Sequence, residues 1–181
     1  MIFRLALLFL AIWPLTVLGA ASHIALPGGD ELWLAIPEAW NQKFEAPDKN
    51  TPPSVWLTQR QGPTFNIFIT PLTGSPMAAA LTDQNKLRSV VTAISRDALA
   101  QSVEMSLPVH ELSGGDVHGS YFAATDRAPK PGEWKYLTQG MVDIDGVPFA
   151  FTILTNDGQE AIAKTALELI RTASLHAPTK V

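Results

Sequence analysis

The sequence predicts an α+β fold, in which a mainly antiparallel sheet of about six to seven strands is covered by two long helices as layers. Three observations predict this. Short segments with apolar residues on one or both faces alternate with turn residues, as in strands. Two longer segments carry apolar residues at the helical spacing of three and four. Short connections containing glycine or proline join most of the strand segments, which is typical of antiparallel hairpins.

The first half of the chain contains three predicted strands. Residues 32–36 form the first, which ends at Pro37 because proline lacks a backbone donor. Residues 55–60 and 65–70 form a hairpin across a Gly-Pro turn. Residues 41–54 contain three prolines with Asp, Lys and Asn, so they are predicted to be a solvated loop.

Two further hairpins are predicted in the second half. Residues 107–112 and 117–124 flank a glycine turn, and residues 134–144 and 147–155 form the second pair. The second pair is joined by Asp145-Gly146, the dipeptide that a type I′ turn prefers. Along 147–155 both faces are apolar, so we expect the sheet to be covered on both sides.

The two amphipathic helices supply at least part of that cover. Thr82 or Asp83 can cap the first helix, whose apolar stripe is Leu87, Val91, Ile94 and Ala98. Asn156 can cap the second, with Gln159 reaching back as in a capping box. The apolar stripe of this second helix is Ile162, Ala166, Leu169, Ile170 and Ala173.

The N-terminal residues have the pattern of a secretory signal peptide. Arg4 precedes an apolar run from Leu5 to Leu18, and the small residues Gly19, Ala20 and Ala21 follow. We expect cleavage near Ala20 to Ser22, and hence a periplasmic or secreted protein. An uncleaved membrane anchor is the alternative, although the run is short for a span and contains a proline.

This pattern divides the chain into a signal peptide (1–21), a single α+β domain (22–176) and a flexible tail (177–181). The full chain has a net charge of −4, and loss of Arg4 would make it −5. Mild acidity without a basic cluster argues against nucleic acid and against an anionic membrane surface as partners. The absence of cysteine excludes disulfides, iron–sulfur centres and thiol catalysis, and no cofactor is expected.

Three segments resemble the fold family shared by Mog1, the photosystem II extrinsic protein PsbP and bacterial DcrB-like proteins. They are Leu34–Trp40 (LAIPEAW), Gly119–Phe122 (GSYF) and Phe149–Leu154 (FAFTIL). The resemblance covers nearly the whole chain after the leader, and together with the leader it indicates an exported bacterial member. It also implies a non-enzymatic domain that docks on another protein or helps to assemble it. The partner itself, an unknown envelope protein, does not follow from the resemblance.

One cluster contains residues of the kind that bind metals. If Gly114-Gly115 is the turn of its hairpin, Glu111 faces His118, and both share a sheet face with Asp116. Such a set could hold a divalent ion weakly. A cross-strand carboxylate–imidazole pair in water is the ordinary interpretation. A periplasmic metal-binding protein or metal-dependent enzyme is therefore the alternative function.

No pattern in the sequence predicts a catalytic residue. The chain lacks the G-x-S-x-G and S-x-x-K patterns of serine nucleophiles. It has 4 histidines, and His23 and His176 lie close to the ends of the predicted domain, which disfavours a triad. We therefore expect a protein that is not an enzyme.

The tryptophans and one loop are the candidate protein-binding residues. Trp33 and Trp56 lie within predicted strands and are expected in the core. Trp40 at a bend and Trp134 at a loop edge are candidates for interface anchors, because an indole buries a large area and keeps a donor. Beside Trp134, Arg127 and Lys130 lie in the proline-containing loop 126–133, so an acidic partner would be expected there.

Overall fold

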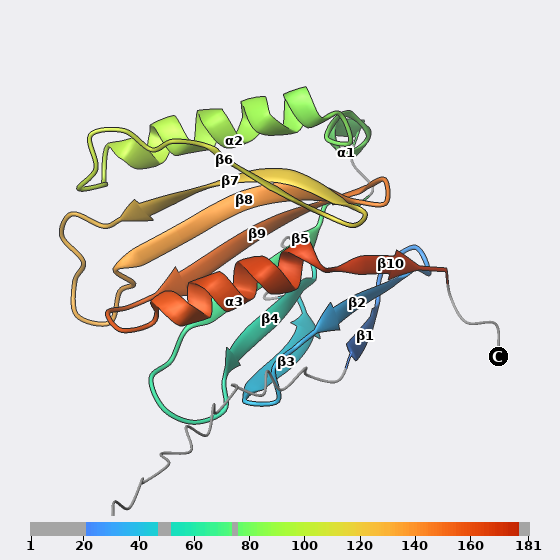
Figure 1. Cartoon of the computed structure of the whole chain (residues 1–181), viewed down its shortest axis with the longest axis horizontal. Helices are drawn as coiled ribbons and strands as arrows, with labels where there is room; N and C mark the ends of the chain where they lie inside the picture. The colour runs from blue at the N-terminus through green and yellow to red at the C-terminus, as the bar shows by residue number, and fades with distance from the viewer. Residues whose placement is uncertain (1–20, 47–51, 74–75, 178–181) are drawn as a thin grey trace, which may run out of the picture.

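Seven antiparallel strands form the main sheet of the computed structural model (Figure 1). Their order across the sheet is β3-β4-β5-β9-β8-β7-β6. The strands are β3 (Trp40–Glu45), β4 (Ser54–Gln59), β5 (Asn66–Pro71), β6 (His110–Gly114), β7 (Val117–Thr125), β8 (Tyr136–Ile144) and β9 (Val147–Thr155). The predicted α+β class and seven-stranded antiparallel sheet are thus confirmed.

The structure describes residues 21–46, 52–73 and 76–177. The predicted signal peptide, up to residue 20, and residues 178–181 of the predicted tail lie outside these ranges. The proposed division of the chain at residues 21 and 177 therefore stays a prediction. Within the described ranges, none of the helices has the length and apolar character needed to cross a bilayer.

Two helices lie on opposite faces of the main sheet. Helix α2 (Gln84–Leu99) has 16 residues and packs chiefly on β7 and β8. Helix α3 (Glu160–Arg171) has 12 residues and packs on the other face, chiefly against β9. The five-residue helix α1 (Pro76–Ala80) precedes α2. Alternate side chains of each strand point to opposite faces, so two separate apolar clusters form, one under each helix.

A second, three-stranded sheet shares the α3 face of the molecule. It consists of β1 (Ala21–Ala25), β2 (Glu31–Ala35) and β10 (Ser174–His176), with β2 in the centre. Only β2 was predicted, because β1 and β10 are short and gain their partners from opposite ends of the chain. On this sheet the Trp33 ring contacts the rings of both His23 and His176, at centroid distances of 4.0 and 4.1 Å.

The predicted loop at 41–54 was wrong in its first part. Residues 40–45 form the edge strand β3, which pairs with β4 along its whole length. Every β3 residue after Trp40 is exposed, so the segment lacks the apolar alternation by which strands are predicted. The pairing is decided by the neighbouring strand, and residues 47–51 lie outside the described part.

The local turn and cap predictions agree well with the structure. Asp145 and Gly146 have φ values of 47° and 83°, as a type I′ turn requires. Asp83 caps α2 through a 3.0 Å hydrogen bond from the Lys86 amide. Before α3, the Asn156 amide donates to Gln159 Oε1 at 2.8 Å, which is the predicted reach-back, although the capping position itself is occupied by Gln159.

The expectation that both sheet faces are covered holds on one side only. Opposed residues on antiparallel strands share a face, so the register assigns every side chain to one side. On the α3 side, strands β4, β5 and β9 bury nearly all their inward residues. On the α2 side of the same strands most residues are only half-buried, because α2 lies farther across the sheet, over β7 and β8.

Candidate functional site

The candidate metal residues do not form the expected group. The β6–β7 pairing places Glu111 opposite Ser120 and His118 opposite Ser113, so the turn consists of Gly115 and Asp116. The pairing predicted across Gly114-Gly115 was therefore wrong by two residues, a shift that keeps Glu111 and His118 on one face. Asp116 moves into the turn. Among the described residues, no group of three or more acidic or histidine side chains could hold a metal ion.

Glu111 and His118 instead line a small polar hollow of about 140 Å³ beside the first turns of α2. Arg88 also lines it and donates a 3.0 Å hydrogen bond to the Val109 carbonyl. Across the strand from His118, burial raises the pKa of Asp143, although a hydrogen bond from Gly146 opposes the shift. This arrangement provides polar contacts without a nucleophile bound to a base.

The burial of Trp40 and of Trp56 differs from what the sequence predicted. Trp40 is only 6% exposed and packs edge-on against Phe65, so it is a core residue and cannot anchor a partner. Trp56, predicted to be core, is half-buried on the α2 side of β4, where its ring meets Phe68. Trp33 is also half-buried, between the two histidines of the small sheet.

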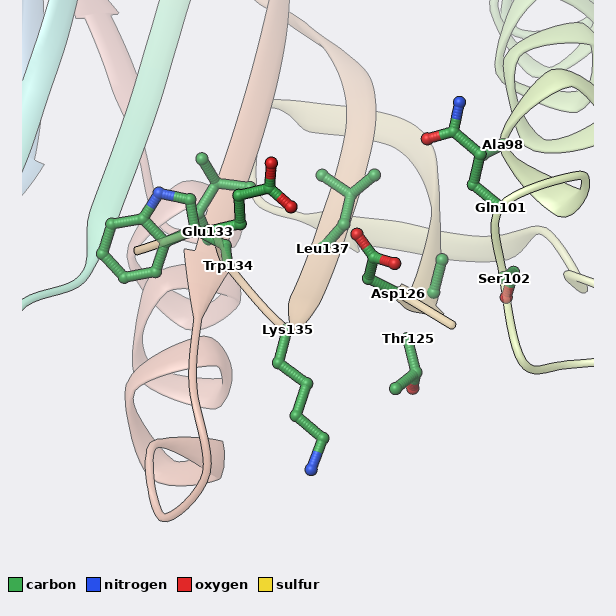
Figure 2. A pocket seen from close by; sticks show the side chains of 11 residues that line it. Ala98, Gln101, Ser102, Thr125, Asp126, Glu133, Trp134, Lys135 and Leu137 are labelled. Carbon is green, nitrogen blue, oxygen red and sulfur yellow. The ribbon is translucent and has the colours of Figure 1, made fainter. Parts of the chain in front are cut away.

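Trp134 lines a larger cavity of about 360 Å³ at one end of the sheet (Figure 2). Ala124, Leu137 and Leu154 lie in one row across β7, β8 and β9 and form its apolar floor. The walls come from the end of α2, the segment after it and the β7–β8 loop. The wall residues are Ala98, Gln101, Ser102, Thr125, Asp126, Glu133, Trp134 and Lys135.

The two cations predicted to meet an acidic partner are already engaged in the structure. The Arg127 guanidinium donates to the Ser102 carbonyl from Nε at 3.1 Å and from Nη2 at 2.7 Å. Lys130 has a side chain that is 81% exposed and lies 3.8 Å from the Glu133 carboxylate. Neither residue lines the cavity, so the predicted group of Trp134 with both cations is only partly brought together.

A partly buried hydrogen-bond network fixes the rim of this cavity. Burial opposes the charge of Glu104, but hydrogen bonds from the Ser102 hydroxyl and the Thr125 amide outweigh it and lower its pKa to about 2. The Val103 amide also donates to the Thr125 carbonyl at 3.0 Å. The segment that follows α2 is thus attached along the end of β7. No local sequence pattern predicts this role, because the contacts with Thr125 join residues more than twenty positions apart.

The floor of the cavity continues into the half-buried side of the sheet. We call this surface the open face; it consists of Trp56, Thr58, Asn66, Phe68, Thr70, Leu137, Gln139, Ala150, Thr152 and Leu154. Trp56, Phe68, Thr152 and Gln139 lie in one row, and Asn66, Leu154 and Leu137 lie in the next. Lys43 and Glu45 of the exposed edge strand β3 border it on the same side of the sheet. Its ten residues are themselves uncharged, and five of them are apolar or aromatic. That composition is typical of the centre of a protein interface.

Solved structures provide the comparison that decides the fold. The solution structure of cyanobacterial PsbP (CyanoP) from Synechocystis sp. PCC 6803 matches with a TM-score of 0.51, over 93% of this chain and 98% of that chain. The chain has a PsbP-like fold. The predicted resemblance is therefore confirmed, at a sequence identity of 11%. No known family matches the sequence, and no curated protein does so either.

Proposed function

We propose that this PsbP-like chain is a non-enzymatic binding or assembly factor that acts on a protein partner in the bacterial cell envelope. The open face is the observation that carries the proposal. A large indole and a phenylalanine remain half-exposed there, although the same strands bury nearly all the residues on their opposite side. Exposed apolar surface of this kind is retained where another molecule covers it.

Three further observations support the proposal, two for a binding role and one for export. The PsbP-like fold supports the non-enzymatic role that the sequence resemblance implies. The Trp134 cavity adjoins the open face and adds a second half-exposed indole to the same side of the sheet. The apolar segment from Leu5 to Leu18, with Arg4 before it, is the basis for proposing export to the periplasm.

Site-specific crosslinking in cells tests the proposed function. A photoreactive phenylalanine replaces Phe68 on the open face, and in the control it replaces Lys164, which is exposed on α3. We expect one envelope protein to be crosslinked from position 68 and absent at position 164, and to bind the purified chain directly. The same adducts at both positions, or none at position 68, would contradict the proposal.

Weak metal binding is the second candidate, because Glu111 and His118 share one face and line one hollow. With no third ligand among the described residues, we predict that micromolar zinc or manganese leaves the melting temperature unchanged. Thermal unfolding with and without each metal measures this. A rise in melting temperature that disappears in Glu111→Gln and His118→Ala would instead support the metal-binding function.

A further inference from the structure

We propose that the Trp134 cavity receives a basic side chain, arginine or lysine, from the partner protein. This inference rests on the proposed function and specifies what one end of the binding surface recognises. It also reverses the sign of the partner's charge that Arg127 and Lys130 suggest in the sequence. Cavity shape and the charges at the cavity rim both point to this class of side chain.

The cavity offers both surfaces that a long cationic side chain needs. Its apolar floor of Ala124, Leu137 and Leu154 can cover an aliphatic stem. The Trp134 indole forms one wall, and a guanidinium or ammonium group is attracted to the face of an indole. A volume of about 360 Å³ accommodates such a side chain with part of its backbone.

Two carboxylates provide negative charge at the cavity rim. Figure 2 shows the carboxylates of Asp126 and Glu133 on either side of Leu137, which is part of the cavity floor. Asp126 Oδ1 accepts a hydrogen bond from the neutral Ala128 amide at 2.8 Å, so this bond leaves the carboxylate's charge uncompensated. Glu133 has Lys130 at 3.8 Å, but that ammonium is largely in water, where the pair interacts weakly.

The other cations near the rim do not neutralise this charge. Lys135 extends away from the cavity in Figure 2, and its ammonium donates to both carboxylate oxygens of Asp157 at 2.7 and 3.0 Å. The Arg127 guanidinium binds the Ser102 carbonyl. An acidic partner side chain would therefore meet two carboxylates, whereas a basic one would form charge-assisted hydrogen bonds with them.

The test uses three short peptides and the exported protein labelled with ¹⁵N. The probes are acetyl-Gly-Arg-Gly-amide, its lysine counterpart, and a peptide with citrulline, the uncharged analogue of arginine. We expect the two basic peptides to shift the Trp134 indole N–H resonance, and to bind about ten-fold more tightly than the citrulline peptide. Equal binding of all three, or no shift of this resonance by the basic peptides, would overturn the inference.

Two matched variants test whether the basic peptides bind in the cavity. Asp126→Asn retains the acceptor for the Ala128 amide but removes the charge, and it should weaken binding of the arginine peptide about ten-fold. Asp97→Asn makes the same change at an exposed acid of α2 that does not line the cavity, and binding should change less than about two-fold. Equal losses in both variants would show a general field effect and would contradict a site in the cavity.

Crosslinking separates this inference from the proposed function. If the crosslink from position 68 is undiminished in Asp126→Asn, the proposal of a protein partner is supported. The proposal that the cavity binds a basic side chain of that partner is then contradicted. If the crosslink weakens in Asp126→Asn but not in Asp97→Asn, both proposals are supported. If no protein partner is crosslinked but the basic peptides still bind about ten-fold more tightly than the citrulline peptide, the proposed function is contradicted. The preference of the cavity for a basic side chain is then still supported.

Discussion

Glu104 shows how a single polar residue fixes the cavity rim. Its carboxylate accepts hydrogen bonds from the Ser102 hydroxyl and from the Thr125 amide, which belongs to β7. Removing the charge would leave a partly buried donor at Thr125 with a weaker acceptor. Hydrogen bonds to charged groups contribute more to stability than neutral ones, so this residue should affect both stability and its dependence on pH.

We predict that Glu104→Gln lowers the free energy of unfolding by about 1.5 to 3 kcal/mol at pH 7. Because the pKa of Glu104 lies at about 2 against an ordinary 4.5, its charge stabilises the fold above about pH 4.5, and this contribution is lost as the pH falls toward 2. Urea unfolding at several pH values measures it. The exposed Glu38→Gln is the control, and a difference independent of pH would contradict the role of the charge.

Substitutions of two tryptophans should distinguish a residue needed for stability from one needed for binding. We predict that Trp40→Ala lowers the free energy of unfolding by about 3 to 5 kcal/mol, because Trp40 is buried against Phe65. Trp56→Thr should cost about 1 kcal/mol or less, since the side chain is half-exposed, yet it should abolish the crosslink from position 68. Equal destabilisation by both changes, measured by urea unfolding, would contradict this assignment.

At the scale of elements, the β8–β9 hairpin is the part whose geometry depends most directly on local sequence. Its nine-residue strands pair along their full length around a two-residue turn. Asp145 and Gly146 both have positive φ, which matches the right-handed twist of the strands. The hairpin also supplies two of the three floor residues of the cavity, Leu137 and Leu154.

We predict that Gly146→Ala lowers the free energy of unfolding by about 1 to 2 kcal/mol, because a Cβ disfavours the left-handed conformation at φ 83°. Asp145→Asn is the matched control at the other turn residue, since asparagine also tolerates this region. Urea unfolding of both variants gives the comparison. A larger loss in the asparagine variant would show that the side chain of Asp145 matters more than the turn conformation.

At the scale of the whole molecule, the two faces of the main sheet differ in how they are covered. Helix α3 and the small sheet share one face, while α2 covers only part of the other. The open face and the Trp134 cavity lie on that second side. A protein that is net acidic thus has a patch of uncharged residues, the open face, and association there avoids repulsion between like charges.

Export is the prediction that concerns the chain as a whole. We predict that protein recovered from the cell envelope begins near Ala20 to Ser22, because the apolar run after Arg4 is followed by small residues. Intact mass spectrometry of the purified protein gives the answer directly. A mass that includes Met1 to Gly19 would show instead that the segment is retained as an anchor.

The sequence by itself determined the α+β class, both major helices, the β8–β9 hairpin and its turn. These features depend on contacts between neighbours in the chain: apolar periodicity, the cap at Asp83 and the Asp145-Gly146 dipeptide. It also identified Trp134 and the adjacent loop as a candidate site. It did not predict the Glu104 network. It predicted an interface role for Trp40, which is buried, and a core position for Trp56, which is half-exposed.

Tertiary structure alone decided β3, the β6–β7 register, the small sheet and the half-covered face. The polar strand β3 exists because β4 offers it a partner, and β1 and β10 meet on β2 although they come from opposite ends of the described chain. The charge of the cavity rim was decided in the same way, because Arg127 is bound to Ser102, twenty-five positions away. Exposure and free charge depend on which distant segments pack together, and no local pattern records that.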